Sequence, residues 1–256
     1  MSALEFGLLV LAGIGAGLTG SIAGLASLIS YPALLAVGVP PVTANVTNTV
    51  ALVLNSVGSV SASRPELTGQ RRRVPRLAVA ALLGGATGMA LLLLTPSSAF
   101  ERIVPWLIAG ASAAILFQRP PRELATEGAL HHAQEQHDPW WIVVGTFAIA
   151  IYGGYFGAGA GVLMLAMYLL GTGEGLPRGN ALKNLMLGLA NTVAAIGYIV
   201  LTHIAWSAAI PLAIGFFGGG RLGPRVVRRA PQTALRRIIA VAGLALAVRL
   251  AVSAYT

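Results

Sequence analysis

The 256-residue chain is 56% hydrophobic and only 10% charged, whereas soluble domains carry about 25% charged residues. Its net charge of +9 comes from arginines in hydrophilic loops, without the aromatic-and-basic clusters that bind nucleic acid, so no nucleic-acid partner is expected. The absence of cysteine excludes disulfides and thiolate metal ligands, and the four scattered histidines favour neither a metal site nor a cofactor.

The first long segment already predicts a membrane protein. Residues 6–63 contain no Asp, Glu, Lys or Arg. A membrane-spanning helix needs roughly 20 apolar residues, so this run holds two or three passes. Its start, MSALEF, is acidic rather than basic, which argues against a cleavable signal peptide. We therefore expect an all-α, polytopic membrane protein in the cell (inner or plasma) membrane, with the lipid bilayer as its surroundings.

About eight hydrophobic segments follow one another along the chain. Two of them are too long for a single pass, and both are interrupted by glycines. Each of these two is expected to form a helix, a break, and a second helix or re-entrant half-helix, which raises the total to as many as ten passes. The predicted segments are 4–38, 42–63, 77–95, 102–118, 139–170, 179–202, 206–220 and 238–255.

The order of features repeats across the chain. A glycine-rich opening, an asparagine-containing helix, a glycine pair of the form GxxxG and a closing helix occur twice in the same order. The sequence thus predicts a first membrane repeat at 1–118, a hydrophilic connecting loop at 119–138 and a second membrane repeat at 139–256.

Charge placement bears on the orientation of the two repeats. Loops 64–76 and 221–237 are both rich in arginine, and basic loops tend to face the cytoplasm. If segment 139–170 crosses twice, each half has five passes, both basic loops lie inside and the halves are inverted. The alternative is one basic loop outside, against the positive-inside preference.

The most informative pattern is a duplicated polar helix face. Residues 44–60 read ANVTNTVALVLNSVGSV, and residues 180–196 read NALKNLMLGLANTVAAI. Polar side chains inside a bilayer are costly, so a duplicated set indicates a function. Gapless alignment pairs Asn48 with Asn184, Asn55 with Asn191, and Thr47 with Lys183.

Lys183 is the only lysine among 17 basic residues, and no acidic residue lies near it in the sequence. A buried cation without a partner is unstable, so one interpretation is that Lys183 binds an anionic substrate. The other is that it extends to the membrane surface as a snorkelling anchor.

Two roles are also open for the asparagines. Spaced seven residues apart, each pair lies on one helix face. Their amides can donate to an oxyanion, or they can form hydrogen bonds between helices. Asn45 and Thr47 enlarge the polar patch of the first half. The glycine-rich break of the second half, with Gly157, Gly159 and Gly161, either packs closely or directs backbone N–H groups at an anion.

The amino-acid sequences of both halves resemble the sulfite exporter TauE/SafE family of membrane permeases. The first half contributes SIAGLASLISYPALLAVGVPPVTANVTN, and the second contributes GAGAGVLMLAMYLLGTGEGLPRGNALKN. One feature departs from the family: its GxGGG pattern in the first half is replaced by AGLAS at residues 23–27. The resemblance implies transport of sulfite, sulfonates or related sulfur-containing anions.

The predicted function is therefore a permease for a small oxyanion, working in the direction of export and without enzymatic activity. Predicted substrate-binding residues are Lys183, Asn184, Asn191, Asn48, Asn55, Thr47, Asn45, Gly157, Gly159 and Gly161.

One alternative is a membrane scaffold without transport, since close helix packing alone would explain the glycines. Another is an intramembrane hydrolase using Ser21 or Ser56 with His203, although no carboxylate orients that histidine. A homo-oligomer is compatible with the sequence.

Overall fold

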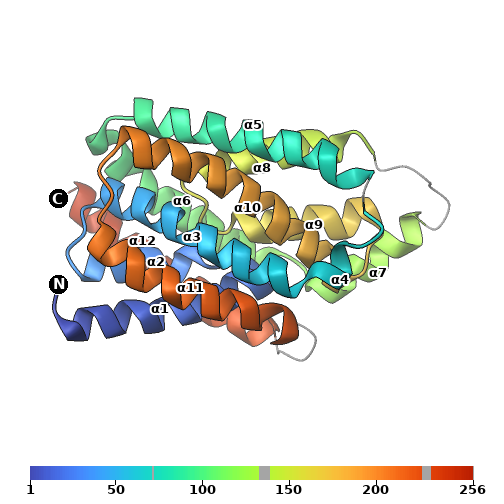
Figure 1. Ribbon diagram of the computed structural model, residues 1–256, viewed down its shortest axis with the longest axis horizontal. Coiled ribbons are helices and arrows are strands. Elements are labelled where there is room, and N and C mark those ends of the chain that lie inside the picture. The colour runs from blue at the N-terminus through green and yellow to red at the C-terminus, as the bar shows by residue number, and fades with distance from the viewer. Residues whose placement is uncertain (71, 133–138, 227–231, 256) are drawn as a thin grey trace.

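The computed structural model describes residues 1–70, 72–132, 139–226 and 232–255. All regular structure in these residues is α-helical, as the sequence predicted (Figure 1). In the described part of the chain, four helices, α1, α5, α6 and α10, are long and apolar enough to cross a membrane by length and composition. The helices are α1 (Ala3–Ala23), α2 (Ser27–Ala36), α3 (Pro41–Ala62), α4 (Arg64–Leu67), α5 (Arg73–Leu94), α6 (Ser97–Phe117), α7 (Pro121–His132), α8 (Trp141–Tyr155), α9 (Ala160–Thr172), α10 (Leu176–Leu201), α11 (Trp206–Val226) and α12 (Gln232–Tyr255).

The two halves pack against each other in a pattern that is unchanged when the halves are exchanged. Helix α1 packs along α11, and its counterpart α8 packs along α5. The pairs α3–α10 and α6–α12 join equivalent helices across the centre. Helices α3 and α10 run in opposite directions, as do α5 and α11 (Figure 1). This is the arrangement that an inverted pair of repeats requires.

Both long apolar segments are broken, as predicted. In the first, α1 ends at Ala23 and Gly24 adopts a left-handed conformation with φ of 76°. In the second, α8 ends at Tyr155, and left-handed glycines at 157 and 159, both with φ of 75°, precede α9. A left-handed backbone ends a helix and strongly favours glycine. Each segment therefore forms a helical hairpin that returns toward the end of the bundle from which it started (Figure 1).

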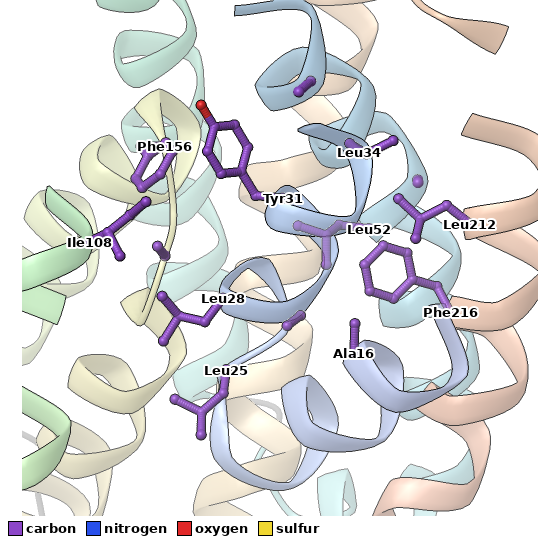
Figure 2. Close-up of a cluster of buried hydrophobic side chains, with 14 of the residues drawn as sticks. Ala16, Leu25, Leu28, Tyr31, Leu34, Leu52, Ile108, Phe156, Leu212 and Phe216 are labelled. Carbon is purple, nitrogen blue, oxygen red and sulfur yellow. The ribbon is translucent and has the colours of Figure 1, made fainter. Parts of the chain in front are cut away.

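The returning helix of the first hairpin is anchored by apolar packing on two sides. Figure 2 shows Leu28 and Tyr31 of α2 on the side of Ile108 and Phe156, with Leu34 on the side of Leu212. The rings of Tyr31 and Phe156 meet edge to face, with centroids 5.3 Å apart. These contacts hold the short helix α2 at a fixed depth.

The repeated glycine pairs let backbones approach closely. Gly84 and Gly88 of α5 contact the backbone of α8, and Gly215 and Gly219 of α11 contact the backbone of α1. A Cβ atom at any of these four positions would collide with the facing carbonyl oxygen. The pairs therefore serve the close packing typical of small residues in membrane helices.

The helix ends that border the two basic loops lie at the same end of the bundle. In Figure 1, α3 and α11 both end there, while α5 and α12 both begin there. At this end Arg73 pairs with Glu174 at 3.1 Å, and Arg221 Nη1 donates to Ser61 Oγ at 3.5 Å. Residue 71 and residues 227–231 of the two loops lie outside the described residues.

Two expectations about element boundaries were imprecise. The connecting segment 119–138, predicted as a loop, contains the twelve-residue helix α7, which packs on α9. Its sequence, PRELATEGALHH, begins with proline at the first helical position and continues with good helix formers. Several helices also start before the predicted apolar span, such as α5 at Arg73, because helical hydrogen bonding continues beyond the apolar length.

Candidate functional site

A small cavity lies where the two helix breaks meet the two asparagine helices, α3 and α10. Its volume is about 50 Å³, several times the roughly 10–15 Å³ that one water molecule requires. Neither Asp nor Glu is among the residues that line it. The lining residues are Gly20, Gly24, Ala26, Ser27, Leu52, Asn55, Ser56, Gly153, Gly157, Ala160, Gly161, Asn184, Leu187 and Asn191.

Asn55 and Asn191, the second asparagine of each repeated motif, both line this cavity. They are 7% and 8% exposed, so water outside the protein barely reaches them. Among the described residues neither amide has a hydrogen-bond partner, and the Oδ1 atom of Asn55 is fully enclosed. A buried amide without a hydrogen-bond partner destabilises a protein by about 1–3 kcal/mol. A polar molecule in the cavity that bonds to these amides would remove this penalty and would be stabilised there.

The amino-terminal ends of both returning helices also meet the cavity. Ala26 and Ser27 begin α2, and Ala160 and Gly161 begin α9. Neither helix has a side-chain cap at this end. In the part of the chain that the structure describes, the backbone N–H groups of Ala26 and Gly161 have no acceptor. Such helix ends carry positive partial charge and favour anions.

The first asparagine of each motif differs from the second in that its amide bonds to the hairpin helices. Asn48 donates to Ser27 Oγ at 3.1 Å and accepts from Ser30 Oγ at 2.6 Å. Asn184 lines the cavity, and it donates to the carbonyl oxygen of Ser21 at 3.3 Å. Thus Asn48 fixes the start of α2 and Asn184 holds the end of α1.

Lys183 does not line the cavity. Its Nζ donates to the carbonyl oxygens of Gly20 at 3.0 Å and Ser21 at 3.4 Å, at the carboxyl end of α1. The side chain is completely buried, so it is not a snorkelling anchor at the surface. It lies directly behind the cavity wall, because Gly20 belongs to that wall.

Asn45 and Thr47 bond to neighbouring parts of the chain rather than to the cavity. Asn45 donates to the carbonyl oxygen of Tyr155 at 2.8 Å, at the end of α8. The hydroxyl of Thr47 accepts from the backbone N–H of Ala205 at 3.1 Å, in the connection before α11. Gly157 and Gly161 line the cavity, whereas Gly159 precedes α9 and faces Ala111.

Ser27, Ser56 and Asn180 were not among the predicted substrate-binding residues. Ser27 lines the cavity at the start of α2, and Asn180 donates to the carbonyl oxygen of Ser21 at 2.8 Å. Asn180 opens the second copy of the motif, where the first copy has Ala44, so a strict comparison of the copies hid it. Ser27 lies in the AGLAS stretch, a polar residue after a glycine-containing break.

The serines of the hydrolase alternative bond within their own helices. Ser21 donates to the carbonyl oxygen of Leu18, and Ser56 donates to that of Leu52. His203 lies in the connection between α10 and α11.

Comparison with known proteins decides the family. The profile described as Sulfite exporter TauE/SafE matches residues 9–250. The chain belongs to the sulfite exporter TauE/SafE family. It is therefore a membrane permease rather than an enzyme or a scaffold.

Curated relatives in this family cover nearly the whole chain. The "Probable membrane transporter protein YfcA" of Escherichia coli K12 is 25% identical over 98% of this chain and 91% of its own length. The "Probable membrane transporter protein ORF9" of a Sinorhizobium species is 25% identical over 92% of this chain and 88% of its own length. A "Probable membrane transporter protein" of Haemophilus influenzae is 26% identical over 90% of this chain and 88% of its own length. No solved structure gives a significant match.

Proposed function

We propose that this protein exports a small oxyanion across the cell (inner or plasma) membrane, with sulfite or an organosulfonate as the substrate. The observation that carries the proposal is the cavity at the crossing of the two hairpins. Among the described residues it presents two amides without a hydrogen-bond partner and two uncapped helix amino ends. The donor Nδ2 of Asn55 lies on the side of Gly20, which lines the cavity, whereas its acceptor Oδ1 faces Gly220.

The chemistry of these groups favours an anion over a cation or a neutral solute. Amide N–H groups and helix amino ends stabilise negative charge without adding a formal charge. A cation would meet no carboxylate in the cavity lining. The size, about 50 Å³, fits a compact oxyanion such as sulfite better than a bulky organosulfonate.

We assign direct contacts with the substrate to Asn55, Asn184 and Asn191, together with backbone N–H groups near Gly157 and Gly161. Asn45, Thr47, Asn48 and Gly159 are assigned to holding the helix ends that shape the cavity. We further propose that residues 1–118 and 139–256 are inverted repeats, because each supplies one hairpin and one asparagine helix to this site.

Transport by purified protein tests the proposal. Proteoliposomes loaded with radiolabelled sulfite should release it faster than protein-free liposomes, and unlabelled sulfite or a small sulfonate inside should compete. The matched control is the double variant Asn55→Ala and Asn191→Ala, reconstituted at equal density, which should release sulfite slowly. Equal release by the wild-type protein and protein-free liposomes would refute the proposal.

A further inference from the structure

The carboxyl end of α1 forms part of the cavity wall, which is unfavourable for an anion site. Gly20 and Gly24, at the end of this 21-residue helix, both line the cavity. Aligned peptide dipoles give a helix carboxyl end about half a negative charge. Left uncompensated, this end would repel an oxyanion held a few ångströms away.

Three side chains of α10 converge on that helix end. Lys183 donates to the carbonyl oxygens of Gly20 and Ser21, and Asn180 and Asn184 both donate to Ser21. A cation at a helix carboxyl end is stabilised by the helix dipole and cancels its field. Lys183 is therefore placed where it neutralises a part of the wall that would repel the substrate.

The equivalent end of the other hairpin receives neutral donors. Asn45 donates to the carbonyl oxygen of Tyr155, and the hydroxyl of Tyr198 donates to that of Gly154 at 2.6 Å. The first motif accordingly has Thr47 at the position where the second has Lys183. Both helix ends meet the cavity, α1 through Gly20 and Gly24 and α8 through Gly153 and Gly157, but only the end of α1 receives a cation among the described residues.

We propose that Lys183 is a positioning residue that gives the cavity its preference for anions through the carboxyl end of α1, without touching the substrate. This inference rests on the oxyanion function proposed above. By neutralising the carboxyl end of α1 from outside the cavity, Lys183 would favour any anion of a given charge, whatever the shape of that anion. A direct ligand, by contrast, distinguishes anions by the positions of their oxygens.

Anion binding by purified variants separates the two roles. The variant Lys183→Met keeps much of the side-chain volume but removes the charge. It should weaken binding of three monovalent anions, hydrogen sulfite in mildly acidic buffer, nitrate and chlorate, by a similar factor, on the order of tenfold, so that their order of affinity is kept. The comparison variant Asn191→Ala should change the three affinities unequally. The effects of the two substitutions should add within about twofold, because the side chains share no partner.

A measurement on the wild-type protein covers the case in which Lys183→Met does not fold. Because Lys183 is the only lysine, labelling with ¹⁵N-lysine gives a single side-chain amine resonance. Saturating sulfite should leave this resonance nearly unshifted if the amine stays on the carbonyls of α1. A large shift, or a changed order of affinities in Lys183→Met, would make the lysine a direct ligand and overturn the inference.

The remaining outcomes are also distinguishable. Normal sulfite affinity in a folded Lys183→Met variant would overturn only this inference, because the wild-type site would still be an oxyanion site. If the wild-type protein bound none of the three anions, the proposed function would fail, and the role of Lys183 with it.

Discussion

Gly24 and Gly161 meet backbone to backbone where the two hairpins cross. Gly24 directly follows the last residue of α1 and Gly161 lies in the first turn of α9, and both line the cavity. A Cβ atom built on Gly161 would lie 2.5 Å from the Cα atom of Gly24, closer than real contacts allow. The crossing of the hairpins therefore depends on glycine at both positions.

Replacing Gly161 with alanine should destabilise the protein. Because the clash is with backbone rather than with a flexible side chain, the hairpins must separate, at a cost of about 1–3 kcal/mol. Thermal unfolding in detergent would measure the loss. The control is Gly15→Ala in α1, where nothing lies within 4 Å of the added atom and no loss is expected. Unchanged stability of Gly161→Ala would show that the crossing is looser than described.

Two asparagines of the repeated motif should respond differently to substitution. Asn191→Ala removes an unpaired amide from the cavity, so the melting temperature should stay the same or rise. The affinity for sulfite should fall about tenfold or more, since a hydrogen bond to a charged group contributes about 1.5–3 kcal/mol. Binding calorimetry and thermal unfolding would report the two effects.

The matched variant Asn48→Ala should instead lose mainly stability rather than sulfite affinity. It removes two hydrogen bonds that hold Ser27 and Ser30, and such bonds contribute about 0.6–2 kcal/mol in membranes. Stability should fall, while sulfite affinity changes less than in Asn191→Ala. The assignment of roles would be reversed if Asn48→Ala lost affinity at full stability.

Both basic loops should face the cytoplasm. Single cysteines in this cysteine-free chain can test this at Thr68 and Arg225, which are exposed at the arginine-rich end. An impermeant thiol reagent added to intact cells should not label either one. A cysteine at exposed Ser98, in the first turn of α6, should be labelled, because α6 begins at the opposite end of the bundle (Figure 1). Labelling at Thr68 or Arg225 from outside would contradict this orientation.

Export should follow the membrane potential without a coupling ion. The cavity lining offers no carboxylate for a proton relay. An inside-negative potential drives a monovalent anion outward with about 2.3 kcal/mol per 100 mV, roughly a fiftyfold gradient. Efflux from proteoliposomes with a potassium–valinomycin potential should speed up when the inside is negative and slow down when it is positive. Flux that ignored the potential and followed a proton gradient would instead implicate His203.

The sequence by itself determined the membrane class and the two broken segments, and it predicted the duplication. These are local properties: apolar length sets the number of passes, and glycines at 24, 157 and 159 adopt backbone conformations that end helices. It also placed the candidate site on the repeated asparagine helices. The helix α7 was missed because its hydrophilic composition indicated a loop, although its residues are good helix formers.

Only the tertiary structure decided which polar residue faces the cavity. Among the described residues, Asn55 and Asn191 lie in it without a hydrogen-bond partner, whereas Asn48 is bonded to α2 and Lys183 is bonded to a carbonyl 163 residues away in the chain. A helical repeat predicts which side chains share a face, but not which helix end that face will meet. The partner of the lone lysine is a backbone carbonyl, and backbone carbonyls occur at every residue, so no sequence pattern could mark it.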